Sequence, residues 1–167
     1  MSIFLKDLPV AVRHQDLQVF IQLREITNLR WPDEVVRQWI YDHGDHLEFL
    51  RDYGDLDLER IRWELEGVPV AELESMPTGP SDQGALEEFA ANHVYWLSRR
   101  PQRIQRAWEV EGTWLVLPIL ISRDLLHPPN RGLQVVEGRM RTGILQGRRS
   151  DSHHVADSHS AWVGRLG

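Results

Sequence analysis

The hydrophobic pattern of the chain changes its period after residue 98, and this change restricts the fold to a class that combines helices with a sheet. Residues 85–98 place apolar side chains three and four positions apart, as an amphipathic helix does. The later runs 114–121 and 133–136 are continuously apolar and have the length of strands. We therefore predict an α+β fold, in which a helical N-terminal half packs on a small mixed β-sheet with helices.

The N-terminal half shows helical spacing in three successive segments. We expect a helix over residues 31–44, where Pro32 and two acidic residues suit the first turn. Shorter helices are expected over 45–54, with Asp45 as the cap, and over 55–65. The stretch 17–26 fits strand and helix almost equally, and strand is slightly preferred.

A boundary is predicted at residues 76–81, which contain two prolines and a glycine. It divides an acidic, mainly helical region (1–80) from an α+β region (81–167). The alternative is that both regions form one compact unit, since 167 residues suffice for a single core.

The chain contains no cysteine. This excludes a disulfide scaffold, thiol catalysis and cysteine-ligated metal sites, and it fits a reducing compartment. No apolar run approaches the roughly 20 residues of a membrane span. Residues 1–12 include Lys6, Asp7 and Pro9 where a signal peptide would be continuously apolar. We expect a cytoplasmic protein with no membrane partner.

Charge is distributed unevenly along the chain. Residues 1–80 contain 8 basic and 16 acidic residues, whereas residues 81–167 contain 11 and 9, for a net charge of −6. An acidic half argues against duplex DNA as a partner, because DNA binding depends on neutralising phosphates. It suits a basic protein instead. One functional hypothesis is therefore a small acidic bacterial immunity protein or antitoxin that binds and neutralises a basic toxin.

The other hypothesis rests on the strand-length run before Gly138 and the helical pattern after it. A helix N-terminus presents amides without internal acceptors and a positive dipole end, which together favour anions. Gly138 would let a phosphate approach the backbone, and arginines one turn on could close on it. The candidate phosphate-binding residues are Glu137, Gly138, Arg139, Arg141 and Thr142. The alternative is an ordinary turn in which Glu137 pairs with an arginine and nothing binds.

The same stretch resembles the ParB/sulfiredoxin-like superfamily over residues 114–147. The resembling features are Pro118 with the apolar run after it, a Pro/Gly turn, a second apolar run and then the sequence Glu137-Gly138-Arg139-Met140-Arg141. The resemblance implies that Gly138 and Arg141 bind the phosphates of a nucleotide, and a nucleoside triphosphate with Mg²⁺ is the candidate ligand.

The departures from the superfamily pattern limit what the resemblance implies. The cysteine and histidine of sulfiredoxins are replaced by Arg139 and Met140, which excludes sulfiredoxin chemistry. The acid in the Gly-Glu-Arg-Arg motif of ParB is replaced by Arg139, so we predict binding without an assigned catalytic residue. Only 24 residues follow Gly143, too few for the helix-turn-helix domain of ParB.

Two other groups of polar residues contain side chains that could bind a metal or transfer a proton. His153, His154 and His159 carry good metal ligands, but their spacing does not stack on one helical face, and no metal site is predicted. Residues 42–46 include carboxylates and imidazoles, which could form a metal site or an acid/base pair. We interpret them as helix caps and surface residues. A basic run after residue 98 either pairs with the acidic half or contacts phosphate or nucleic acid; it consists of Arg99, Arg100, Arg103 and Arg106.

Overall fold

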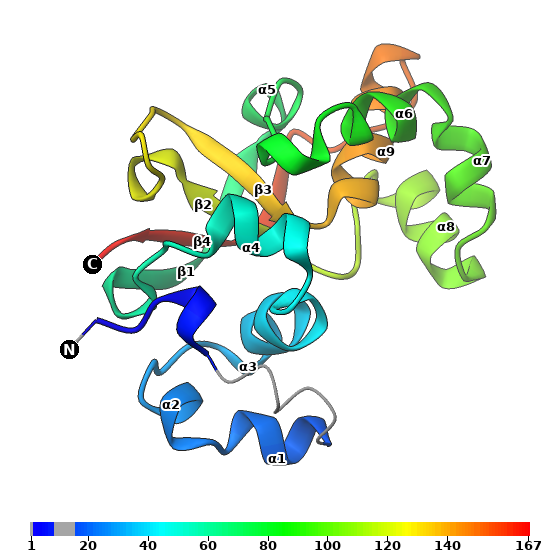
Figure 1. Cartoon of the computed structure of the whole chain (residues 1–167). Coiled ribbons are helices and arrows are strands. Elements are labelled where there is room, and N and C mark those ends of the chain that lie inside the picture. Colours follow the sequence, from blue (N-terminus) through cyan, green and yellow to red (C-terminus); the bar gives the residue numbers. More distant parts are fainter. Residues whose placement is uncertain (1, 9–15) are drawn as a thin grey trace.

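The computed structural model describes residues 2–8 and 16–167. Part of the segment 1–12, for which no signal peptide was expected, therefore lies outside the described residues. Figure 1 shows the arrangement of the elements, where η marks a 3₁₀ or π-helical segment. In chain order they are η1 (Leu5–Asp7), α1 (Leu17–Ile21), α2 (Arg24–Thr27), α3 (Asp33–Val35), η3 (Val36–Tyr41), α4 (Leu47–Tyr53), η4 (Leu58–Arg60), β1 (Ile61–Pro69), α5 (Val70–Leu73), η5 (Pro80–Asp82), α6 (Ala85–Ala91), α7 (His93–Ser98), α8 (Gln102–Val110), β2 (Ile119–Ser122), η6 (Arg123–Leu125), β3 (Leu133–Glu137), α9 (Arg139–Ser150) and β4 (Ser158–Leu166).

The strands form one mixed sheet in the order β1-β4-β2-β3. β1 pairs antiparallel with β4, from Ile61 opposite Leu166 to Pro69 opposite Ser158. β2 runs parallel to β4 and antiparallel to β3. The predicted α+β class with a small mixed sheet is confirmed, and Figure 1 shows α1 to α3 below the sheet, α4 in front of it and α6 to α9 beside it.

Two apolar cores lie on the two faces of the sheet. Because successive side chains of a strand point to opposite faces, Ile119 and Ile121 of β2 join the core made with the N-terminal helices. Leu120, between them, joins the core made with α8 and α9. The continuous apolar run that the sequence showed here is therefore explained by burial on both faces.

An aromatic cluster fills the N-terminal core. The Trp39 side chain is completely buried, and its ring centroid lies 5.5–6.0 Å from those of Trp31, Phe49, Tyr53 and Trp63. The cluster joins η3, α4 and the segment before α3 to β1. Rings of this size contribute much of the apolar area that a core buries, so the N-terminal helices are held to the sheet mainly through aromatic contacts.

Two local predictions were wrong. Residues 17–26, slightly preferred as a strand, form α1 and the start of α2, and the Asp16 side chain caps α1 by accepting from the Gln18 amide. The helix expected over 55–65 is limited to the short η4, after which the chain enters β1. The alternation of apolar and charged residues from Ile61 to Glu66 is a strand pattern, which outweighs the helix propensity of Leu and Glu.

The predicted helices over 31–44, 45–54 and 85–98 are present, with differences at a cap and within two of the segments; residues 36–41 are π-helical. The cap of α4 is His46 instead of Asp45, without a side-chain hydrogen bond. The segment 85–98 is divided at Asn92 into α6 and α7. In the described ranges, no helix combines the length and apolar character needed to cross a membrane.

The segment 76–81, predicted as a boundary, is packed between α4 and β3. The Val135 amide donates to the Pro77 carbonyl at 2.9 Å. Asp52 of α4 accepts from the Ser81 hydroxyl and amide at 2.8 and 3.0 Å. β1 from residues 1–80 also pairs with β4 from residues 81–167. Both predicted regions thus contribute strands to one sheet.

Close helix packing positions α9 against α6. A Cβ on Gly143 would lie 2.4 Å from the Phe89 Cβ, and one on Gly147 would lie 2.2 Å from the Ala90 carbonyl oxygen. Glycine at both positions lets the two helix backbones approach each other. This contact fixes the direction in which α9 leaves the sheet.

Candidate functional site: the N-terminal end of α9

Gly138 forms the junction between β3 and α9. It is the N-cap residue of α9 and has φ of +101°, a conformation that L side chains rarely adopt. A Cβ would also lie 2.7 Å from the Pro118 Cβ. The strand, glycine and helix predicted from the sequence therefore occur in that order, and the first-turn amides of α9 lie next to a residue without a side chain.

The Arg141 guanidinium lies over Gly138 and is held by several acceptors. Its Nη1 donates to the Val116 carbonyl at 3.0 Å, and Nη2 donates to Gln38 Oε1 at 3.2 Å. Nη2 also lies 3.5 Å from Glu137 Oε1. Burial lowers the pKa of Arg141, and the charge of Glu137 opposes that shift. Arg141 thus connects η3, the loop before β2 and the start of α9.

Glu137 lies between Arg141 and a pair of histidines. Its Oε2 is 2.9 Å from His43 Nε2, and His43 Nδ1 is 3.2 Å from His46 Nδ1. Burial would raise the pKa of Glu137, but the hydrogen bond from His43 and the charges of His43 and Arg141 outweigh it and lower the pKa. The histidines of segment 42–46 therefore contact the candidate site, which the sequence had not indicated.

Arg139 and Thr142, both predicted to bind phosphate, occupy different environments. The Arg139 side chain is partly exposed and forms an ion pair with Asp82. Thr142 is completely buried, and among the described residues its hydroxyl has no hydrogen-bond partner. Thr142 is not among the residues that line the cavity described below, so it makes no contact in the proposed site.

A cavity of about 420 Å³ opens in front of this helix end. Its wall includes Glu137, Gly138, Arg139 and Arg141, four of the five candidate residues. The remaining wall comes from η3, α6, the connection between α7 and α8, α8, the loop before β2 and α9 itself. It comprises Gln38, Phe89, Arg100, Ile104, Trp108, Trp114, Leu115, Val116, Met140 and Ile144. The cavity therefore has a cationic part at the helix end and an aromatic and aliphatic part under α8.

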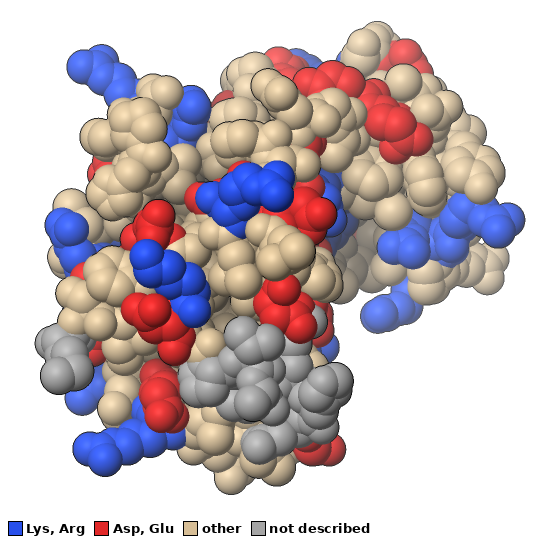
Figure 2. Space-filling model, in the orientation of Figure 1, with Lys and Arg blue, Asp and Glu red and all other residues tan. Residues whose placement is uncertain are grey.

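Arg100 belongs to the basic run that the sequence singled out. Its side chain lines the cavity, and its carbonyl accepts from Gln105 Nε2 at 2.7 Å. Figure 2 shows that basic side chains gather along the part of the molecule formed by α7 and α8. Of the four arginines in this run, Arg100 is the one among the residues that line the cavity.

The three C-terminal histidines do not form one cluster. His159 is buried in β4, 2.7 Å from the Thr113 hydroxyl and 2.9 Å from the Ala156 carbonyl, and burial lowers its pKa. His153 is exposed and lies beside His93 and Asp151. The sequence spacing did not indicate the group around His153, because its second histidine, His93, comes from α7.

Comparison with known proteins adds no relative. No family model matches the chain, and neither the curated proteins nor the solved structures include a significant match. The fold and the site define an α+β protein with a cationic cavity at a strand–glycine–helix junction. The resemblance to the ParB/sulfiredoxin-like superfamily remains a prediction from residues 114–147.

Proposed function

We propose that this protein binds a nucleotide, or a similar phosphate ester, in the cavity at the N-terminal end of α9. The observation that carries the proposal is the composition of one cavity wall, which joins the Gly138 turn, Arg139, Arg141 and Arg100 to a set of aromatic side chains. A volume of about 420 Å³ lies in the range of roughly 300–1,000 Å³ that small-molecule sites occupy.

The phosphate would occupy the helix end. The amides of residues 139–141 precede the first intrahelical bond, in which the Thr142 amide donates to the Gly138 carbonyl at 2.9 Å. They add to the positive end of the helix dipole. Arg139 and Arg100 supply two guanidinium groups that can form paired hydrogen bonds to phosphate oxygens.

Arg141 has a different part in this proposal from the one the resemblance implies. Because its Nη atoms already donate to Val116 and Gln38, its main contribution is to hold the Gly138 turn in place. Its Nε faces Gly138, 3.1 Å from where a Cβ would stand, and is available to assist at the same anion.

The apolar part of the cavity suits a base. Trp108, Trp114 and Phe89 line it, and aromatic rings offer stacking surfaces for a heterocycle. The carboxylate of Glu137 pairs with Arg141, and that of Asp82 pairs with Arg139. Because both carboxylates are paired with arginines, we propose that Mg²⁺ is held by the phosphates of the nucleotide and that the site binds the nucleotide without an assigned catalytic residue.

The test is calorimetric and thermal-shift titration of the full chain with CTP, ATP, GTP and their diphosphates, each with and without Mg²⁺. Saturable binding is expected, and Arg100→Ala and Arg139→Ala should each weaken it by about tenfold or more, as loss of a charge-assisted contact does. Arg103→Ala is the matched control, since Arg103 is exposed and does not line the cavity.

Absence of binding by every nucleotide, or equal binding by the Arg100 and Arg103 variants, would contradict the proposal. The next experiment would then address the immunity-protein or antitoxin hypothesis. Charge reversals at acidic residues between 42 and 66 should in that case abolish binding of a basic protein partner, because the acidic half would form its docking surface.

A further inference from the structure

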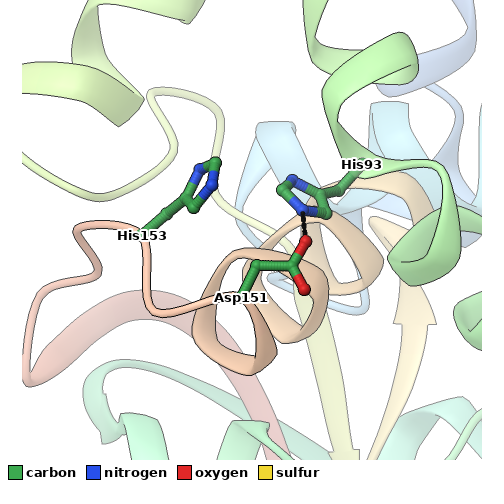
Figure 3. A group of neighbouring side chains, drawn as sticks. All are labelled: His93, Asp151 and His153. Atoms are coloured by element: carbon green, nitrogen blue, oxygen red, sulfur yellow. Dashed lines mark hydrogen bonds and ion pairs between the residues drawn. The ribbon is translucent and has the colours of Figure 1, made fainter.

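A second group of polar side chains lies near the C-terminal end of α9. His93 begins α7, Asp151 follows the last residue of α9, and His153 comes two residues later. One ligand atom from each residue lies within 4.8 Å of the other two. Figure 3 shows the three side chains meeting from the α7 side and from the turn after α9.

His93 is the buried member of this group. The residue is 2% exposed, and its Nε2 lies 2.7 Å from Asp151 Oδ2. Its Nδ1 is buried and, among the described residues, has no hydrogen-bond partner. Because Nε2 faces Asp151, it is the ring nitrogen that can share an ion with this carboxylate, and the proton of the neutral ring then lies on Nδ1.

The turn after α9 holds the other two donors in place. The Asp151 amide donates to the Gly147 carbonyl at 3.0 Å, and the His153 amide donates to the Arg148 carbonyl at 2.8 Å. The imidazole of His153 lies 5.1 Å from that of His93, with the ring planes nearly perpendicular. The carboxylate of Asp151 and the ring of His153 are therefore carried by backbone that is hydrogen-bonded to α9, and the ring of His93 is carried by the start of α7.

Two imidazoles and one carboxylate form a donor set that divalent transition metals prefer, with Zn²⁺ the most common choice for such ligands. We infer that His93, Asp151 and His153 bind a divalent transition-metal ion of the Zn²⁺ type. The ion would link the start of α7 to the end of α9. This site is independent of the cavity at the other end of α9.

The surroundings leave room for further ligands on the ion. A second cavity, of about 400 Å³, is lined by His93 and His153 together with Glu109, Arg148 and His154. Zn²⁺ takes four ligands in most protein sites, and three protein ligands leave one position for water or an added anion. Arg148 donates to the His154 and Trp108 carbonyls, so its charge is directed toward these acceptors.

The test uses the untagged full chain after treatment with a chelator. Titration with Zn²⁺ by calorimetry, and with Co²⁺ by visible absorption, should give one saturable site. Asp151→Asn and His153→Ala should each weaken binding by about tenfold or more, as loss of a donor at a metal site does. Both residues are exposed, so these variants should keep the native circular dichroism spectrum.

His127→Ala is the matched control, because His127 is an exposed histidine outside the group. It should bind Zn²⁺ as the unmodified chain does. The inference is overturned by an absence of saturable binding, by equal affinity of the His153 and His127 variants, or by a Co²⁺ spectrum that is the same with and without His153.

Discussion

The N-terminal end of α9 is lined by arginines and first-turn amides, whereas two imidazoles and a carboxylate lie beside its C-terminal end. The first set suits an anion and the second suits a cation. This distribution follows the helix dipole, which is positive at the N-terminus and negative at the C-terminus. The comparison shows how one helix of 12 residues can orient two candidate sites of opposite charge.

The packing of α9 on α6 supports both ends, so its disruption should have the largest effect. Gly147→Val would place a Cβ 2.2 Å from the Ala90 carbonyl oxygen. We expect a loss of about 3 kcal/mol in the free energy of unfolding, because two helix backbones would have to separate. Urea denaturation measures this, and a loss below about 1 kcal/mol would show that the helices can adjust.

Arg141→Met should destabilise only the N-terminal end. The change removes the donor to the Val116 carbonyl and to Gln38 Oε1 and breaks the ion pair with Glu137 Oε1, and we expect a loss of about 2 kcal/mol. Arg141→Lys should recover less than half of the lost stability, since one ammonium group cannot donate to several acceptors at once in the planar arrangement of a guanidinium. Denaturant titration gives both values, and Zn²⁺ binding at the other end should be unchanged.

Glu137→Gln tests the electrostatics at the same end. The pKa of Glu137 is held below its ordinary value of 4.5 in the folded chain, so the ionised carboxylate stabilises the fold at neutral pH. That stability is lost as the pH falls below about 4.5 and through the folded pKa. The variant should therefore be less stable at pH 7 and should lose less stability between pH 5 and 3. Parallel slopes for the two proteins would contradict this.

Arg149→Ala at the C-terminal end should have the smallest effect. Arg149 pairs with Glu74, but its side chain is 51% exposed, so solvent screens the pair. We expect a loss of about 0.5 kcal/mol, a fraction of that for Arg141→Met on the same helix. Chemical denaturation of the two variants side by side would show whether burial determines the difference.

The sequence predicted the part of the site that depends on neighbouring residues. An apolar run, a glycine and a helical pattern with arginines are contiguous, and the structure places them as β3, Gly138 and α9. Gln38, 103 residues before Arg141, could not be linked to it from the sequence. The same holds for His93 and Asp151, which are 58 residues apart. Such pairs are created by tertiary packing.

The strands β1 and β4 were harder to predict than β2 and β3. β4 carries Ser, His and Gly among its apolar residues, and its continuous apolar signal is too short to distinguish it from a loop. β1 contains Leu and Glu, which favour helices in isolation, and its strand pairing with β4 decides the outcome. Local propensity thus failed where the partner strand is almost 100 residues away.

The contact between Pro77 and Val135 has a consequence for aggregation. β3 is a terminal strand of the sheet, and such strands expose backbone groups that can recruit another chain. The Val135 amide donates to the Pro77 carbonyl, so intermolecular pairing is blocked there. The opposite terminal strand, β1, carries Arg62, Glu64 and Glu66 and ends at Pro69. Charge and proline disfavour edge-to-edge stacking at that side as well.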